Sequence, residues 1–154
     1  MNSFRQLLFW FCLLLSAHKL VAQKIQYSNP PGLPVSKNYT QIVVTQASRV
    51  AYISGQVSAN SQGEIVHKGD FRGQTRQVHE NLKTALASMG ATFVDVAKLT
   101  TYVVNTDEEK IGIVREVRNQ FYTGPNPPAS TYVGVQGLYD KDVLIEIEAI
   151  VVLK

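Results

Sequence analysis

The chain has 154 residues, of which 45% are hydrophobic and 18% are charged. This is the composition of a globular protein of about one domain, and it excludes a disordered chain. The sequence pI is about 9.0, but the 15 basic residues are spread along the chain, whereas a nucleic-acid groove needs them clustered. We therefore expect no nucleic-acid partner.

The first 22 residues resemble a secretory signal peptide. Arg5 supplies a positive charge, residues 7–17 are uninterruptedly apolar, and Ala22 offers a cleavage point. The alternative, a membrane anchor, is disfavoured because the apolar segment is shorter than the roughly 20 residues that span a bilayer. We expect export to the periplasm or the medium, no stable membrane insertion after cleavage, and a single domain over residues 23–154. The only cysteine, Cys12, would leave with the leader.

Residues 23–38 contain several prolines and a glycine in a short space, which predicts an irregular arm. Residues 39–45 and 49–57 are then two β-rich runs separated by a short polar segment, as in a hairpin. Gly55 in the second run marks a bulge or a close approach by another group. Asp70 is well placed as the N-cap of an amphipathic helix that stops at Gly90.

Residues 95–104 alternate between two faces and predict a further strand. A second helix follows, with Thr106 and Glu109 as its capping box, and it ends before Gly124. Residues 127–153 predict two terminal strands. The order is therefore ββαβαββ, which predicts an α+β fold with the helices covering one face of the sheet.

The last strand carries two carboxylates on a face that needs a cover. From residue 143 to 153 the odd positions are all apolar, whereas the even positions include Glu146 and Glu148 beside large aliphatic side chains. Such a face needs a partner, for example another subunit. Carboxylates about 6–7 Å apart on one strand can support acid–base chemistry when desolvated. Alternatively, each acid pairs with a basic residue at an interface, for example Lys98 on another strand.

No metal, phosphate-loop or nucleophile motif is present in the sequence. His79 lies on the predicted first helix, where a packed or surface role is favoured over a role as a ligand. His67 is the only other histidine after the leader. We therefore expect no metal and no cofactor. The polar residues that remain for a site are Tyr39, the corner at Ser54 and Gly55, and the segment 130–132.

Several segments, in matching order and spacing, point to one known family. They are YISGQ (52–56), QVHENL (77–82), residues 95–102, 121–122 and 128–130, and IEIEAI (145–150). As a set they resemble the RidA family of reactive-intermediate deaminases. The resemblance implies a chorismate-mutase-like fold with a mixed sheet. It also implies a homotrimer, in which the sheets pack around a central barrel and small-molecule clefts lie between subunits.

Active members of that family hydrolyse enamines and imines, such as 2-iminobutanoate, to 2-oxo acids and ammonia. In them an arginine that follows Pro-Ala binds the substrate carboxylate through a bidentate pair, and a glutamate in the last strand positions the attacking water. The glutamate corresponds to Glu146, but Ser130 stands in place of the arginine. Arg115 and Arg118 on the second helix are candidates for the missing charge, the alternative being that they are solvated helix residues.

The resemblance also places Tyr39 and Ser54 in the ligand cleft. Gly55 adjoins Ser54, and Thr131 and Tyr132 follow Ser130. Three functions stay open on this reading. The first is a hydrolase in which Glu146 activates water against a small metabolite. The second is a non-catalytic trimer that binds a small ligand. The third, a ribonuclease, is disfavoured because the sequence shows neither a basic groove nor a histidine pair.

Overall fold

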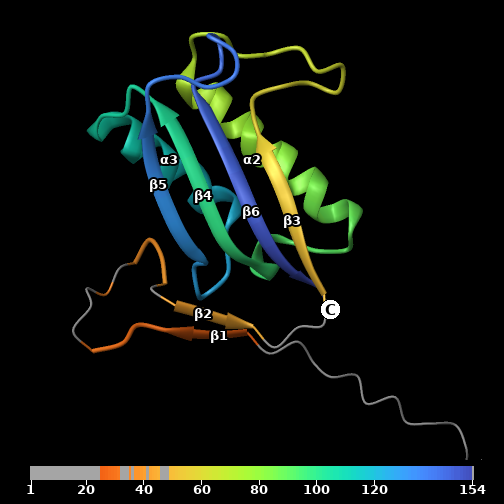
Figure 1. Cartoon of the computed structure of the whole chain (residues 1–154), viewed down its shortest axis with the longest axis vertical. Helices are drawn as coiled ribbons and strands as arrows, with labels where there is room; N and C mark the ends of the chain where they lie inside the picture. The colour runs from red at the N-terminus through yellow and green to blue at the C-terminus, as the bar shows by residue number, and fades with distance from the viewer. Residues whose placement is uncertain (1–24, 32–34, 36, 41, 46–48, 154) are drawn as a thin grey trace, which may run out of the picture.

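The structure is a computed structural model, and it describes residues 25–31, 35, 37–40, 42–45 and 49–153. The expected signal peptide over residues 1–22 lies outside the described residues. Two long helices lie behind a four-stranded sheet, and a smaller two-stranded sheet lies below it in Figure 1. Within the described ranges no helix is both long and apolar enough to cross a membrane.

The main sheet is mixed and has the strand order β3-β6-β4-β5. Its strands are β3 (Arg49–Gln56), β4 (Val96–Val104), β5 (Ala129–Val135) and β6 (Ile145–Leu153). The last strand, β6, is antiparallel to both of its neighbours, whereas β4 and β5 are parallel. A parallel pair requires a crossover connection, and here that connection contains α3 (Glu108–Phe121).

The predicted hairpin between residues 39–45 and 49–57 is wrong. Instead β1 (Ile25–Ser28) pairs with β2 (Ile42–Thr45), and β3 pairs with β6. The prediction of an irregular arm missed β1, because the prolines that suggested irregularity all follow this strand and lie in its connection to β2. The long alternating run of β6 offers β3 a partner over most of its length, which the short β2 could not.

The two helices begin at aspartates. Asp70 caps α2 (Phe71–Ser88), accepting a hydrogen bond at 2.9 Å from the backbone N–H of Gly73, as predicted. The cap of α3 is Asp107, which accepts from the N–H of Lys110 at 2.8 Å. The prediction of Thr106 as the cap is therefore wrong by one residue, because Asp107 is the last extended residue before the helix.

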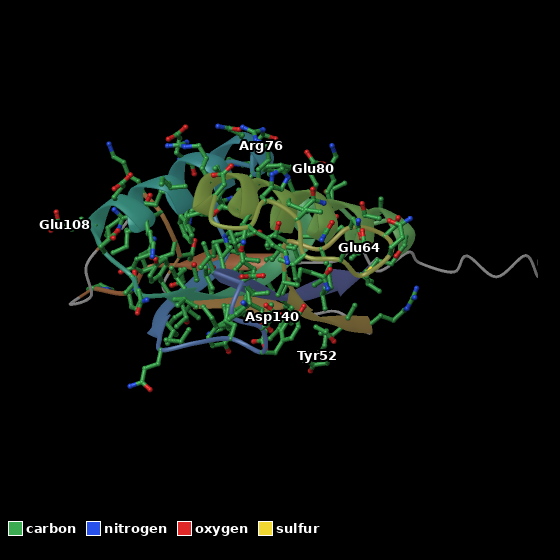
Figure 2. The ribbon with its side chains drawn as sticks, turned by 90° about the horizontal axis from the view of Figure 1, so that it is seen from above. Tyr52, Glu64, Arg76, Glu80, Glu108 and Asp140 are labelled. Carbon is green, nitrogen blue, oxygen red and sulfur yellow. The ribbon has the colours of Figure 1, made fainter. Side chains whose placement is uncertain are left out.

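The core lies between the helices and one face of β6. The odd-numbered side chains of β6 from Ile145 to Val151 are buried, and they pack with Leu82 and Leu86 of α2 in one apolar cluster. The predicted strand from residue 95 starts one residue later, because Asp95 belongs to the short 3-10 turn η2 (Phe93–Asp95). The α+β fold with a mixed sheet is confirmed, and Figure 2 shows both helices on the same side of that sheet.

The other face of the main sheet is not covered by either helix, α2 or α3. Tyr52 of β3 is 79% exposed, and Figure 2 shows it pointing away from the helices. Val50 on the same strand is 42% exposed. We call this side of the sheet the open face. The expected cover over it stays a prediction, because a single chain is described.

Candidate functional site

The predicted site residues fall into two groups on opposite faces of the main sheet. Along β5, Ser130 and Tyr132 are in register with the buried Leu99 and Thr101 of β4, so they point toward the helices. Along β6, Glu146 is in register with Tyr102 and belongs to the open face. The alternation of strand side chains thus separates residues that are close in the sheet.

A cavity of about 190 Å³ lies on the helix side, between β4, β5 and α3. We call it the α3 cavity. It brings together five of the predicted site residues: Tyr39, Arg115, Arg118, Ser130 and Tyr132. Pockets for drug-sized ligands are usually about 300–1,000 Å³. This cavity therefore suits a ligand of only a few heavy atoms.

The segment that carries Tyr39 is tied to the start of β5. The hydroxyl of Thr40 donates to the carbonyl of Pro127 at 2.7 Å, and the N–H of Thr40 donates to that of Pro128 at 3.2 Å. These bonds place Tyr39 at the cavity beside Ser130. The phenol of Tyr132 is hydrogen-bonded to the hydroxyl of Thr106 at 2.8 Å, and burial raises its pKa.

Two arginines of α3 bring positive charge to the α3 cavity. Arg118 donates from Nη1 to the carbonyl of Asn38 at 2.8 Å, which links the helix to the Tyr39 segment. Burial lowers the pKa of Arg118, and the charge of Arg115 adds to this effect, yet a guanidinium stays protonated at neutral pH. Among the described residues, ion pairs form at Lys68, Arg72 and Lys83. Neither arginine of the cavity has a carboxylate partner there.

Sequence reasoning missed His79 as a cavity residue. Its side chain is buried, with 1% exposure, and it lines the α3 cavity from α2. Its Nδ1 lies 2.8 Å from the carbonyl oxygen of Thr75. A signal was present, because His79 falls about one helical turn from Leu82 and about two turns from Leu86, on the same buried stripe. A polar side chain on such a stripe requires a partner.

The open face holds the second group. The carboxylate of Glu146 lies over Gly55: a Cβ on that glycine would stand 1.7 Å from Oε1. Burial raises the pKa of Glu146, and the nearby charge of Glu148 raises it further. The side-chain carboxylate of Glu146 makes no hydrogen bond or ion pair with any described residue. Ser54 lies on this side as well, because it shares the parity of the exposed Val50 and Tyr52 along β3. Thr131 does too, because it follows Ser130, which points toward the helices, along β5.

Within the described chain neither acid pairs with Lys98, and a pairing at an interface stays a prediction. Glu148 accepts a hydrogen bond from the hydroxyl of Tyr102 at 3.1 Å. Lys98 donates instead to the hydroxyl of Thr131 at 3.1 Å. Burial raises the pKa of Glu146, and no basic residue of the described chain pairs with its carboxylate. Both properties are expected of a carboxyl that takes part in proton transfer.

A larger hollow, of about 650 Å³, lies elsewhere between α2, η2 and the end of α3. On its rim Arg76 donates to the neutral amide oxygen of Gln120 at 2.9 Å, and Lys83 lies 3.7 Å from the carboxylate of Glu80. Figure 2 shows Arg76 and Glu80 on the outer side of the helices. The α3 cavity is the better candidate site, because it brings together five of the predicted site residues, two of which are arginines without a carboxylate partner among the described residues. No group of three or more metal-binding side chains gathers in the described part of the chain.

Comparison with known proteins agrees with this architecture. The family model described as Endoribonuclease L-PSP matches residues 32–153. A RutC family protein of Pyrococcus horikoshii is 42% identical over 113 residues, which cover 73% of this chain and 84% of the relative. A protein of Dermatophagoides farinae named 2-iminobutanoate/2-iminopropanoate deaminase is 32% identical over 116 residues, covering 75% of this chain and 86% of its own.

Among solved structures, a Rid-family protein of unknown function from Yersinia pestis superposes with a TM-score of 0.79 at 37% identity. The match covers 84% of this chain and 98% of that one. The RidA protein of an Antarctic Psychrobacter matches with a TM-score of 0.60 at 27% identity, covering 83% and 99% of the two chains. The chain therefore belongs to the endoribonuclease L-PSP family, the family of the RidA and RutC proteins.

Proposed function

We propose that this protein binds a small carboxylic acid in the α3 cavity and hydrolyses its imine or enamine form to the 2-oxo acid and ammonia. The observation that carries the proposal is the pair Arg115 and Arg118 at a cavity of about 190 Å³, with no carboxylate partner among the described residues. Arginine recognises a carboxylate by charge-assisted, often bidentate hydrogen bonds. The helix arginines would thus supply the charge that Ser130 lacks.

The proposal gives Glu146 the task of activating water. Its carboxyl has a raised pKa and no partner in the described chain, as a general base or acid requires. However, Glu146 and the α3 cavity lie on opposite faces of one sheet. A homotrimer would resolve this separation if the open face of one subunit met the cavity mouth of the next. The exposure of Val50 and Tyr52 on the open face supports such contacts.

The same separation favours a second candidate, a non-catalytic trimer that holds a small acid without turning it over. In that case Glu146 would serve only at a subunit contact. We also propose that the protein is exported after removal of residues 1–22, so that its ligand is met outside the cytoplasm. The relative named as a deaminase supports the choice of imines as first substrates to test.

The test is an assay of residues 23–154 for 2-oxobutanoate formation from 2-iminobutanoate generated in situ. Loss of a buried charge-assisted pair costs about 2–5 kcal/mol, so Arg118→Ala should lower kcat/KM by roughly 30- to 4,000-fold. Arg115→Ala is compared beside it. Arg76→Ala, on the outer side of α2, is the matched control and should leave turnover unchanged. Glu146→Gln should abolish turnover.

Three results would redirect the proposal. Full turnover in both Arg115→Ala and Arg118→Ala would remove the arginines from substrate binding. Full turnover in Glu146→Gln would remove the carboxylate from the chemistry. No turnover above buffer in the wild type, together with measurable binding of 2-oxobutanoate, would establish the second candidate.

The proposed assembly is tested by the molecular mass of the protein in solution. A mass other than that of a trimer would overturn it.

A further inference from the structure

We propose that His79 is a ligand-binding residue of the α3 cavity: its Nε2 accepts a hydrogen bond from an N–H or O–H group beside the ligand carboxylate. The inference rests on the proposed function, because it assumes that a small acid enters this cavity. It narrows the ligand class to 2-imino, 2-amino or 2-hydroxy acids, as distinct from acids without a donor next to the carboxylate.

The hydrogen bond of His79 to its own helix fixes the tautomer. Nδ1 lies 2.8 Å from the carbonyl oxygen of Thr75, and a carbonyl oxygen can only accept, so Nδ1 carries the proton and donates. A neutral imidazole with a proton on Nδ1 has a lone pair on Nε2. Burial keeps the ring neutral, since it lowers the pKa of His79 to about 4.

Nε2 is the ring nitrogen of His79 that is available to a ligand in the cavity. The centroid of His79 lies 5.2 Å from that of Phe121 and 6.3 Å from that of Phe93, both in stacked geometry. The phenylalanines therefore pack against the faces of the imidazole, and Nδ1 is hydrogen-bonded to the helix backbone. Among the described residues no donor reaches Nε2, although the side chain is 1% exposed and lines the cavity. A buried acceptor without a donor is costly, so a ligand that satisfies it gains affinity.

The arginines and His79 would then bind two adjacent groups of one small molecule. Arg115 and Arg118 attract the carboxylate, and His79 accepts from the group on the neighbouring carbon. An imine nitrogen carries such a donor, whereas the carbonyl oxygen of a 2-oxo acid does not. The substrate would therefore be held more tightly than the product, which favours product release.

The experiment measures binding of two probes to the exported chain, residues 23–154, by calorimetry. 2-Hydroxybutanoate carries a donor next to its carboxylate, and butanoate has none. His79→Phe removes the acceptor and keeps an aromatic ring in the cluster. Thr75 is not orphaned by this change, because its carbonyl still accepts the helical N–H of residue 79. His79→Gln is the conservative variant, since its amide oxygen can accept near the position of Nε2.

The wild type should bind 2-hydroxybutanoate about 10-fold more tightly than butanoate. His79→Phe should abolish this preference with little effect on butanoate, and His79→Gln should restore part of it. In the wild type, the ¹⁵N resonance of His79 Nε2 should shift with 2-hydroxybutanoate and not with butanoate. This measurement decides the matter even if His79→Phe fails to fold.

Equal binding of the two probes by the wild type would overturn the inference, as would a preference that survives in His79→Phe. In both cases the proposed function would stand, because the carboxylate would still be bound. If neither probe binds to the wild type, the α3 cavity does not take small acids, and the proposed function fails together with the inference.

Discussion

Replacing Gly55 by alanine tests how the Glu146 carboxyl is held. A Cβ at Gly55 would stand 1.7 Å from Oε1 of Glu146, 2.5 Å from Cδ and 2.7 Å from Cγ. Ordinary contact begins at 3.4 Å, so the carboxylate oxygen must retreat by about 1.7 Å. The backbone of Gly55 is outside the left-handed region, so the alanine itself introduces no backbone strain.

The expected cost in stability is small, because only a flexible side chain has to move. A displaced rotamer costs about 0.5–1.5 kcal/mol. Replacement of a glycine at a compatible position restores about 0.4–1 kcal/mol by restricting the unfolded chain. The free energy of unfolding should therefore change by less than about 1 kcal/mol. Turnover should fall on the order of 100-fold, because a reacting group is displaced by more than about 1 Å.

The position of the carboxyl can be followed directly by the pKa of Glu146. In the wild type burial raises this pKa, and displacement toward solvent should return it toward its ordinary value. Carboxyl ¹³C NMR over a pH titration measures both forms. Gly137→Ala is the matched control, because a Cβ there would meet nothing within 4 Å. An unchanged pKa of Glu146 in Gly55→Ala would refute the reasoning.

Two further predictions concern stability. Asp107→Ala should lower the free energy of unfolding, measured in urea, by about 1 kcal/mol, because it removes the cap of α3. Thr106→Ala should lower it by less, because the Thr106 hydroxyl bonds only to Tyr132 at the surface. Equal losses in the two variants would restore Thr106 as the cap. For His79 the folded pKa, about 4, lies below the ordinary 6.5, so the unfolded chain binds more protons between these values. Stability is then complete above pH 6.5 and is lost as the pH falls toward 4, by on the order of 3 kcal/mol.

His79→Phe is the control for the second of these predictions. Arg118 lowers the pKa of His79, and Glu80 raises it, but burial is the largest cause. Removal of the imidazole should therefore remove most of the difference in unfolding free energy between pH 6.5 and 4. An equal pH dependence in His79→Phe would show that other groups, such as the Asp142 carboxylate beside Lys68, produce the loss.

Features that depend on local sequence were predictable. The alternation of β6 and the cap at Asp70 both follow from contacts within a few residues, and both are confirmed. Gly55 was correctly marked as either a bulge or a close approach, and both are present: the register with β6 shifts between Ile53 and Gln56, and the Glu146 carboxylate lies over the glycine. The single glycine in the β3 run thus indicated a contact with Glu146, which is distant in the sequence.

Features that depend on pairing between distant segments were not predictable. β3 pairs with β6 along most of its length, from Arg49 to Gln56, whereas the 4 residues of β2 could offer it only a shorter register. The contact of Arg118 with the Asn38 carbonyl joins residues 80 positions apart, and no local pattern indicates it. The separation of Glu146 from Ser130 by the thickness of the sheet follows from register alone.

The most direct test of the central claim is a crystal structure of residues 23–154 grown with 2-oxobutanoate. The account predicts the ligand in the α3 cavity, with its carboxylate within hydrogen-bond distance of Arg115 or Arg118. It further predicts that Glu146 of a neighbouring subunit closes the site. A ligand held elsewhere, or one whose carboxylate is bound without either arginine, would contradict the account.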